Sequence, residues 1–214
     1  MTPQQASKAA RDIAARAPII PVLVVQDVAH ARPLAEALVA GGLPALEVTL
    51  RTPAALEVIA EMAKVDGGIV GAGTLLTPED VKRAKDAGAL FGVSPGATDR
   101  LLAACEEADL PLLPGASSAS EAMRLFERGY DMLKFFPAEA AGGAGFLKSL
   151  ASPLPQIAFC PTGGINTRNV SDYLSLPNVV CAGGSWVAPA DLMERGDWDA
   201  ITALARTASE LSRD

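Results

Sequence analysis

Histidine and cysteine are scarce in this chain of 214 residues, which contains one histidine and three cysteines. The cysteines, Cys105, Cys160 and Cys181, are odd in number, widely spaced and never arranged as CxxC, and His30 falls in a predicted helix. Structural zinc sites and disulfide frameworks require closer groupings of these residues. The sequence therefore predicts no metal site and no disulfide framework, and His30 is read as a helix residue rather than a catalytic one.

Positive charge is also limited, since 18 lysines and arginines face 25 aspartates and glutamates, for a formal net charge of −7. Without a basic cluster, a nucleic-acid-binding surface is excluded. No apolar run approaches the roughly 20 residues that span a membrane. Residues 1–18 are polar and amphipathic, unlike the apolar core of a signal peptide. We expect a cytoplasmic protein that contacts neither nucleic acid nor membrane.

What the sequence does contain is an alternation of short apolar strands and Ala/Leu-rich helices. The predicted strands are Ile19–Val25, Ala45–Leu50, Ile69–Ala72, Leu90–Ser94, Leu110–Leu113, Met132–Phe136, Ile157–Pro161 and Val179–Ala182. The predicted helices between them cover 28–40, 53–64, 78–87, 98–108, 118–128, 143–150 and 167–174. Strands that alternate with helices indicate parallel βαβ units and an α/β fold.

Eight strands within about 215 residues favour a (β/α)8 TIM barrel. We expect one domain over 1–214, in which 1–17 form an extra N-terminal helix. An open doubly wound sheet is the alternative, although the turn after the first strand has no GxGxxG or P-loop. N-cap residues are predicted at Thr52, Thr77 and Ser118, and glycine C-caps at Gly41, Gly88 and Gly129.

Lys134 is the first candidate for chemistry, because it lies in an apolar strand. Period-two alternation places it on one face with Met132 and Phe136. Apolar burial disfavours the charged ammonium and enriches the neutral, nucleophilic amine, which is how a Schiff-base lysine is made. The alternative is a lysine that extends to the barrel rim or binds phosphate as a simple cation.

The second candidate is the polar face of the strand that contains Glu47, Thr49 and Arg51. Helices cover the outside of a barrel, so this face should point inward. Glu47 could act as a general acid and base, and Arg51 could hold a carboxylate in a bidentate fork. A buried structural Glu–Arg pair is the alternative.

Two glycine-rich turns, Pro161–Ile165 and Gly183–Ser185, follow the seventh and eighth predicted strands. Backbone N–H groups in those loops form a recurrent phosphate site in TIM barrels. Such a site needs little formal positive charge, which suits an acidic chain. Ordinary tight turns are the alternative. Thr74, after the third strand, could donate a hydrogen bond to a substrate carboxylate.

Taken together, six motifs resemble the family of 2-keto-3-deoxy-6-phosphogluconate (KDPG) aldolases and 4-hydroxy-2-oxoglutarate aldolases. They are LEVTLRT (46–52), GAGT (71–74), SPG (94–96), KFFPAE (134–139), CPTGGI (160–165) and GGSW (183–186). The resemblance runs from about residue 18 to residue 210. It implies a (β/α)8 barrel assembled as a homotrimer, without metal or organic cofactor.

The resemblance also implies roles for individual residues. Lys134 would form a Schiff base with pyruvate, and Glu47 would shuttle protons. The other implied roles are Arg51 and Thr74 for the pyruvate carboxylate, Gly163, Gly164 and Ser185 for the phosphate, Thr162 for selection of the gluconate epimer at C4, and Pro95 and Phe136 for support of the site. The expected substrate is a phosphorylated 2-keto acid.

Two other functions remain open from the sequence. One is a non-covalent sugar-phosphate epimerase or isomerase on a phosphate-binding barrel, in which Lys134 is only a cation. The other is a non-catalytic sugar-phosphate sensor, which would have little reason to keep both Glu47 and Lys134.

Overall fold

The structure is a computed structural model, and it describes residues 1–212 of the chain. The strands are β1 (Ile19–Leu23), β2 (Ala45–Thr49), β3 (Ile69–Gly73), β4 (Phe91–Val93), β5 (Leu112–Leu113), β6 (Gly115–Ala116), β7 (Met132–Phe135), β8 (Ala158–Pro161) and β9 (Ala182–Gly184). The helices are α1 (Pro3–Ala14), the 3-10 helix η1 (Val28–His30), α2 (Ala31–Ala40), α3 (Ala55–Met62), α4 (Pro78–Asp86), α5 (Asp99–Glu107), α6 (Ala119–Arg128), α7 (Gly143–Leu150), α8 (Val170–Leu174), α9 (Ala190–Arg195) and α10 (Trp198–Ser209).

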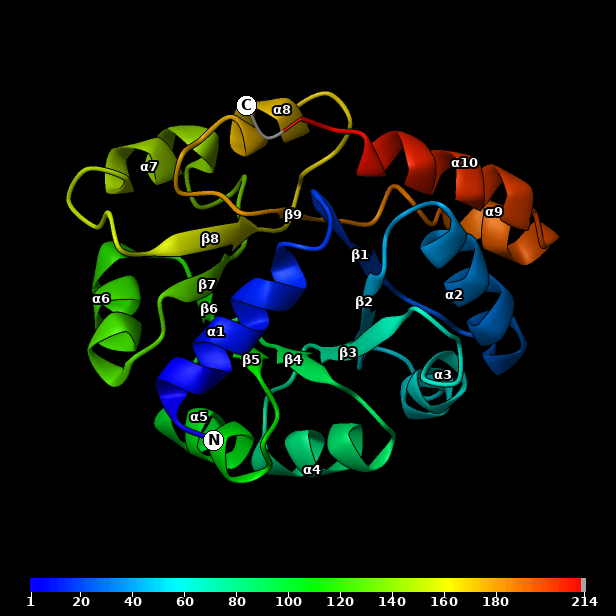
Figure 1. Ribbon diagram of the computed structural model, residues 1–214, viewed down its shortest axis with the longest axis horizontal. Helices are drawn as coiled ribbons and strands as arrows, with labels where there is room; N and C mark the ends of the chain where they lie inside the picture. The colour runs from blue at the N-terminus through cyan, green and yellow to red at the C-terminus, as the bar shows by residue number, and fades with distance from the viewer. Residues whose placement is uncertain (213–214) are drawn as a thin grey trace.

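The strands pair in parallel as two curled sheets. One has six strands in the order β5-β4-β3-β2-β1-β9, and the other has three in the order β6-β7-β8. Isolated parallel bridges join Phe159 to Val179 and Thr162 to Gly183. Figure 1 shows the strands around the centre of the molecule and the helices other than α1 outside them. The chain therefore has an α/β fold with a curled parallel sheet.

The alternation of side chains along the strands builds two apolar layers. Leu46 and Val48 of β2 belong to the large core cluster, which also contains Leu34 of α2. The opposite faces of the strands contribute to a smaller inner cluster that includes Phe91 and Met132. Glu47 and Thr49, on the other face of β2 from Leu46 and Val48, are 3% and 0% exposed. The prediction that this polar face points into the interior is confirmed for Glu47 and Thr49, whereas Arg51 lies beyond the end of β2 and is exposed.

Helix α1 covers one end of the inner cluster. Its last residue, Ala14, is 1% exposed and belongs to that cluster, and Ile13 packs against it. In Figure 1 the helix crosses the middle of the molecule. The side chain of Ser7 accepts hydrogen bonds from the backbone N–H groups of Asp131 and Met132, at 2.9 and 3.0 Å. These contacts fix α1 to the beginning of β7.

Several predicted boundaries differ from the structure. The fifth predicted strand, Leu110–Leu113, is shortened to β5 (Leu112–Leu113), and β6 (Gly115–Ala116) was not predicted. Pro114, which has no N–H for the ladder, separates the two. The predicted helix 28–40 is divided into η1 and α2, and the last strand extends over Ala182–Gly184 rather than Val179–Ala182. Helices α9 and α10, which follow β9, were not predicted.

The predicted N-caps are confirmed at two of three positions. The side chains of Thr77 and Ser118 accept hydrogen bonds from backbone N–H groups in the first turns of α4 and α6. Thr52 is wrong as a cap, because its hydroxyl donates instead to the carbonyl oxygen of Val25, at 2.7 Å. Helix α3 begins only at Ala55. The Thr52 side chain thus ties the end of β2 to the end of β1.

Among the predicted glycine C-caps, Gly88 and Gly129 have left-handed backbones, with φ of 99° and 113°. Gly41 is the C-cap of α2, but the left-handed conformation expected of it is wrong, because its φ is −80° and Gly42, with φ of 90°, takes that conformation. A Cβ atom at Gly41 would lie 2.4 Å from the Cβ of Ala205. Close packing against α10 therefore explains that glycine.

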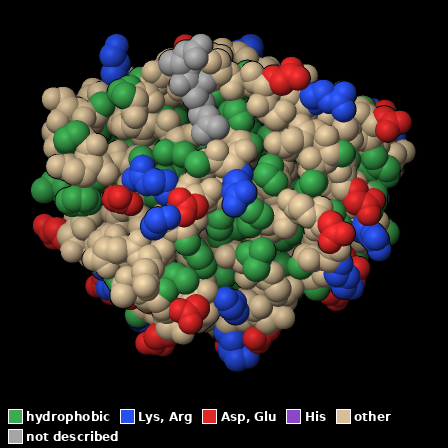
Figure 2. Space-filling view, in the orientation of Figure 1, with side chains coloured by type: hydrophobic (Ala, Val, Ile, Leu, Met, Phe, Trp, Pro, Cys, Tyr) green, Lys and Arg blue, Asp and Glu red, His purple; other side chains and the backbone are tan. Residues whose placement is uncertain are grey.

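On the face shown in Figure 2, basic and acidic side chains are interspersed rather than separated by sign. No helix within residues 1–212 combines the length and the apolar character needed to cross a membrane.

Candidate active site

The side chains of Lys134 and Glu47 meet in the interior of the curled sheet. Lys134 Nζ donates a hydrogen bond of 3.2 Å to Glu47 Oε1, and the two side chains are 5% and 3% exposed. They come from β7 and β2, which are separated by 87 residues in sequence. The ammonium also lies 5.4 Å from the centroid of the Phe136 ring. An amine and a carboxyl group are thus held together in a desolvated place, where a proton can pass between them.

Glycines make room for this pair. Gly73, at the end of β3, does not have a positive φ, so its backbone conformation does not require glycine. The reason is space, because a Cβ atom there would lie 2.3 Å from Glu47 Oε1. On the other side, Gly115 of β6 is the register partner of Lys134. A Cβ atom at Gly115 would lie 2.3 Å from the backbone of Pro95. The absence of two side chains therefore allows Glu47 and Pro95 to approach the lysine strand.

Arg51 and Thr74 form a second contact, just beyond the ends of β2 and β3. Arg51 Nε donates a hydrogen bond of 3.2 Å to Thr74 Oγ1. Thr74 has φ of 63°, a left-handed conformation that is costly for a β-branched residue and is found mainly at functional sites. Thr74 directly follows Gly73, which lies beside Glu47. The Arg51–Thr74 contact is therefore close to the Lys134–Glu47 pair.

Thr49, the third polar residue on the inner face of β2, has a structural partner. Its hydroxyl donates a hydrogen bond of 2.8 Å to the carbonyl oxygen of Leu23 in β1. The hydroxyl is therefore satisfied without a ligand.

The two glycine-rich turns border one cavity of about 200 Å³. Its lining residues are Val22, Val24, Arg51, Thr162, Gly163, Gly164, Ile165, Gly183 and Ser185. Gly163 and Gly164 have φ of 101° and 79°, and within the described residues their N–H groups donate no hydrogen bond. Two free N–H groups opposite an arginine make this cavity suitable for an anion such as phosphate.

Backbone hydrogen bonds connect this cavity to the lysine strand. The N–H of Thr162 donates a hydrogen bond of 2.9 Å to the carbonyl oxygen of Phe135. The N–H of Ala138 donates one of 2.8 Å to the carbonyl oxygen of Thr162. A Cβ atom at Gly163 would lie 3.3 Å from the Phe136 ring, so this ring packs on the turn. The amine and the anion cavity therefore occupy fixed positions relative to each other.

The sequence model of the KDPG and KHG aldolase family matches residues 11–204. The chain is 54% identical to the 2-dehydro-3-deoxy-phosphogluconate aldolase of Pseudoalteromonas atlantica, over 92% of this chain and 93% of that protein. It is 51% identical to the KHG/KDPG aldolase of Escherichia coli, over 94% of this chain and 95% of that protein. The chain belongs to the KDPG and KHG aldolase family.

A solved structure adds a chemical observation on a relative. The KDPG aldolase of Legionella pneumophila, in which pyruvate was captured at low pH as a covalent carbinolamine intermediate, superposes with a TM-score of 0.90. It is 46% identical to this chain and covers 94% of it, while the match covers 98% of the Legionella chain.

In this family member, all ten residues predicted for the site lie around the two contacts and the cavity described above. Lys134 and Glu47 form the inner pair, with Pro95 and Phe136 beside the lysine strand. Arg51 contacts Thr74 and also lines the cavity, which further contains Thr162, Gly163, Gly164 and Ser185. Their roles in binding and catalysis stay predictions. Within residues 1–212, no group of three histidine, cysteine, aspartate or glutamate side chains could hold a metal ion.

Sequence reasoning gave no role to Gly73, which leaves space for Glu47. We expect Gly73→Ala to reduce cleavage activity by at least about tenfold, because the new methyl group must displace the carboxylate from Lys134. Overpacking should lower the free energy of unfolding by about 1–3 kcal/mol. Steady-state kinetics and thermal unfolding measure both effects.

A matched control is Gly145→Ala in α7, where an added Cβ atom meets nothing within 4 Å. This variant should keep full activity and gain about 0.5–1 kcal/mol of stability, since alanine suits a helix better than glycine. Full activity in Gly73→Ala would show that Glu47 does not need its present position.

Proposed function

We propose that this protein is a class I aldolase that cleaves KDPG to pyruvate and glyceraldehyde 3-phosphate. Cleavage of 4-hydroxy-2-oxoglutarate to pyruvate and glyoxylate is proposed as a second activity, in keeping with the family. The observation that carries the proposal is the buried Lys134 amine, 3.2 Å from the Glu47 carboxylate, in a chain about half identical to KDPG aldolases.

The reaction begins when the neutral amine of Lys134 attacks the C2 ketone of the substrate. Loss of water from the carbinolamine gives an iminium ion, which accepts the electrons of the bond between C3 and C4. Glu47 takes the proton of the C4 hydroxyl as that bond breaks, and the aldehyde leaves. Glu47 then returns a proton to C3 of the enamine, and water releases pyruvate and the free amine. The reaction consumes no cofactor.

The remaining site residues bind the two charged ends of the substrate. Arg51 and Thr74 hold the pyruvate carboxylate, and the backbone at Gly163, Gly164 and Ser185 holds the phosphate. Arg51 also lines the glycine-rich cavity, so its charge acts on both anionic ends. Thr162 selects the gluconate configuration at C4, while Pro95 and Phe136 fix the walls of the site.

Borohydride reduction in the presence of pyruvate tests this proposal. Reduction of the iminium ion should attach a stable three-carbon adduct to Lys134 and nowhere else, as mapped by mass spectrometry. A non-covalent epimerase or isomerase forms no adduct, and a sensor releases no pyruvate in a coupled assay. An adduct on another lysine, or none, would refute the assignment.

We further propose that the two sheets are parts of one closed (β/α)8 barrel, and that the chain is a single domain over 1–214. The bridge between Thr162 and Gly183 supports closure on one side, and on the other side only Pro114 separates β5 from β6. The main core cluster extends from Ala6 to Ala208, which supports one domain. A cytoplasmic location is proposed as well, supported by the buried thiols of Cys105 and Cys160, which form no disulfide bond.

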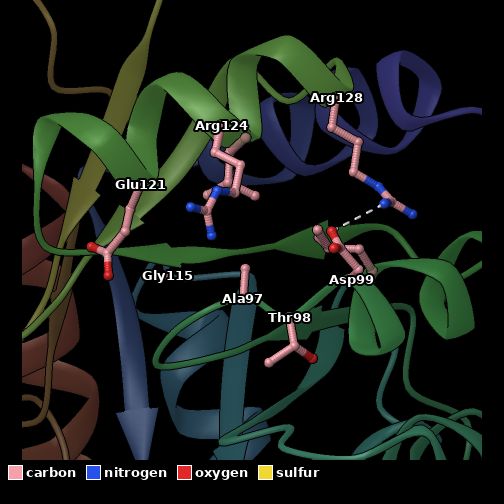
Figure 3. A pocket seen from close by; sticks show the side chains of 9 residues that line it. Ala97, Thr98, Asp99, Gly115, Glu121, Arg124 and Arg128 are labelled. Carbon is pink, nitrogen blue, oxygen red and sulfur yellow. Dashed lines mark hydrogen bonds and ion pairs between the residues drawn. The ribbon is translucent and has the colours of Figure 1, made fainter.

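We also propose a homotrimer, with an interface over α6 that includes the groove between α5 and α6. The groove has a volume of about 400 Å³ (Figure 3). Arg124 points into it, between Glu121 and the ion pair of Arg128 with Asp99. On the same helix, Met123 and Phe126 are 49% and 40% exposed. These two residues lie on another face of α6 than the groove, and Phe126 lines a second hollow together with α1. Exposed apolar side chains on a helix that also borders a groove with both charges suit contact with another copy of the chain through α6.

Light scattering coupled to size-exclusion chromatography measures this assembly. The wild-type chain should have the mass of three copies, and the double variant Met123→Glu/Phe126→Glu should have the mass of one. Leu90→Glu, at a residue 55% exposed outside α6, is the control and should stay trimeric. A trimer that survives the double substitution places the interface elsewhere.

A further inference from the structure

Glu139, which is exposed, and the buried Tyr173 form a partly buried contact beside the glycine-rich cavity, and neither has a role in the proposed reaction. The Tyr173 hydroxyl donates a hydrogen bond to Glu139 Oε1. Tyr173 belongs to α8 and is 1% exposed. Burial and the hydrogen bond to Glu139 raise the pKa of the phenol, so the group stays protonated and keeps donating at neutral pH.

Glu139 lies directly against the turn that lines the cavity. Its N–H donates a hydrogen bond of 3.1 Å to the carbonyl oxygen of Gly163. A Cβ atom at Gly164 would lie 2.6 Å from Glu139 Cγ and 2.8 Å from its Cβ. The stem of Glu139 therefore occupies the space beside Gly164, and its carboxylate continues to Tyr173.

The other side of the turn is held by amide side chains. The Nδ2 atoms of Asn166 and Asn169 donate hydrogen bonds of 3.2 and 3.1 Å to the carbonyl oxygen of Gly164. With both carbonyl groups engaged, the peptide planes at Gly163 and Gly164 have a fixed orientation. The Gly163 carbonyl shares its peptide plane with the N–H of Gly164, and the Thr162 carbonyl, which accepts from the N–H of Ala138, shares its plane with the N–H of Gly163. Both N–H groups are therefore presented in a fixed direction for a ligand.

We propose that Glu139 and Tyr173 are positioning residues that fix the Gly163–Gly164 turn for binding of the substrate phosphate. The inference rests on the proposed function, because it takes a phosphorylated substrate as the ligand of this turn. Glu139 lies five residues after Lys134, so the same segment that contains the amine also sets the direction of the phosphate-binding N–H groups. The span between the reacting carbon and the phosphate is thus fixed by one loop.

Pairs of substrates with and without phosphate distinguish this role from simple structural support. Tyr173→Phe and Glu139→Ala should each lower kcat/KM for KDPG by about tenfold, mainly through KM, since a hydrogen bond to a charged group has that effect. Cleavage of 4-hydroxy-2-oxoglutarate, which has no phosphate, should change by less than about twofold. Glu139→Gln retains a side-chain oxygen that accepts the Tyr173 hydrogen bond, and it should behave like the wild type.

Tyr130→Phe is the matched control. Tyr130 is also a buried tyrosine whose hydroxyl donates to a glutamate, Glu106, at 3.1 Å, and it lies outside the site. This variant loses an equivalent hydrogen bond and should keep the wild-type ratio of the two kcat/KM values. A ratio that shifts equally in Tyr130→Phe and Tyr173→Phe would overturn the inference.

Binding of inorganic phosphate, measured by calorimetry, tests the inference without the cleavage reaction. The Kd should rise about tenfold in Tyr173→Phe and in Glu139→Ala and stay unchanged in Glu139→Gln. An unchanged Kd in both disruptive variants contradicts the positioning role even if the aldolase activity is real. Conversely, the wild-type chain could form no borohydride adduct while the two disruptive variants still raise the Kd for phosphate. That outcome would refute the proposed aldolase and support the positioning role.

Discussion

Replacing Lys134 with methionine is expected to lower kcat for KDPG cleavage by a factor on the order of 10⁴ or more, because the covalent intermediate cannot form. Methionine has a similar length and is apolar, so it suits a residue that is 4% exposed between Leu133 and Phe135. A coupled assay for pyruvate measures the rate. Borohydride reduction with pyruvate should leave the variant unlabelled.

The exposed Lys148 in α7 provides the control, since Lys148→Met removes a charge of the same kind outside the site. That variant should keep both its rate and its adduct on Lys134. Substantial pyruvate release by Lys134→Met would mean that cleavage does not pass through this amine. Thermal unfolding is measured for both variants, because Lys134→Met leaves the buried Glu47 carboxylate without its partner.

Glu47→Gln is expected to lower kcat by about 10²–10⁴-fold, since the amide fits beside Gly73 but cannot exchange a proton with substrate. Schiff-base formation at Lys134 should still be detectable with pyruvate and borohydride at long incubation times. Exchange of the pyruvate C3 protons with deuterated water, followed by NMR, should slow by a comparable factor. These two measurements separate proton transfer from capture of the ketone.

Glu57→Gln, at an exposed position of α3, should leave both rates unchanged. If Glu47→Gln lowered cleavage and left C3 exchange at the wild-type rate, Glu47 would act only on the C4 hydroxyl. The proposed mechanism, in which Glu47 performs both proton transfers, would then need a second proton donor for C3.

Much of the site could be predicted from sequence because strand alternation is a local property. In β7, period two alone places Lys134 opposite the outward-facing Leu133 and Phe135. The same rule turns Glu47 inward on β2. The resemblance to aldolases added what periodicity could not supply, namely that these two residues, 87 positions apart, belong to one site.

The features that sequence reasoning missed depend on packing between distant segments. Threonine before proline is a usual helix N-cap, but the Thr52 hydroxyl donates instead to the carbonyl oxygen of Val25, which lies 27 residues earlier in the sequence. Gly73 is a glycine because of Glu47 on the neighbouring strand, and no local motif reveals this. By contrast, the omission of α9 and α10 was avoidable, since Gly196 and Asp197 carry the usual signals for a helix end and a new N-cap.

The closure of one end of the inner cluster by α1 has a kinetic consequence. If small molecules enter and leave only past the glycine-rich turns, the fragment joined to Lys134 occupies the innermost position. The aldehyde must then depart before pyruvate can be hydrolysed from the lysine and escape. In the direction of synthesis, pyruvate must bind first, so product-inhibition patterns should be those of a strictly ordered mechanism.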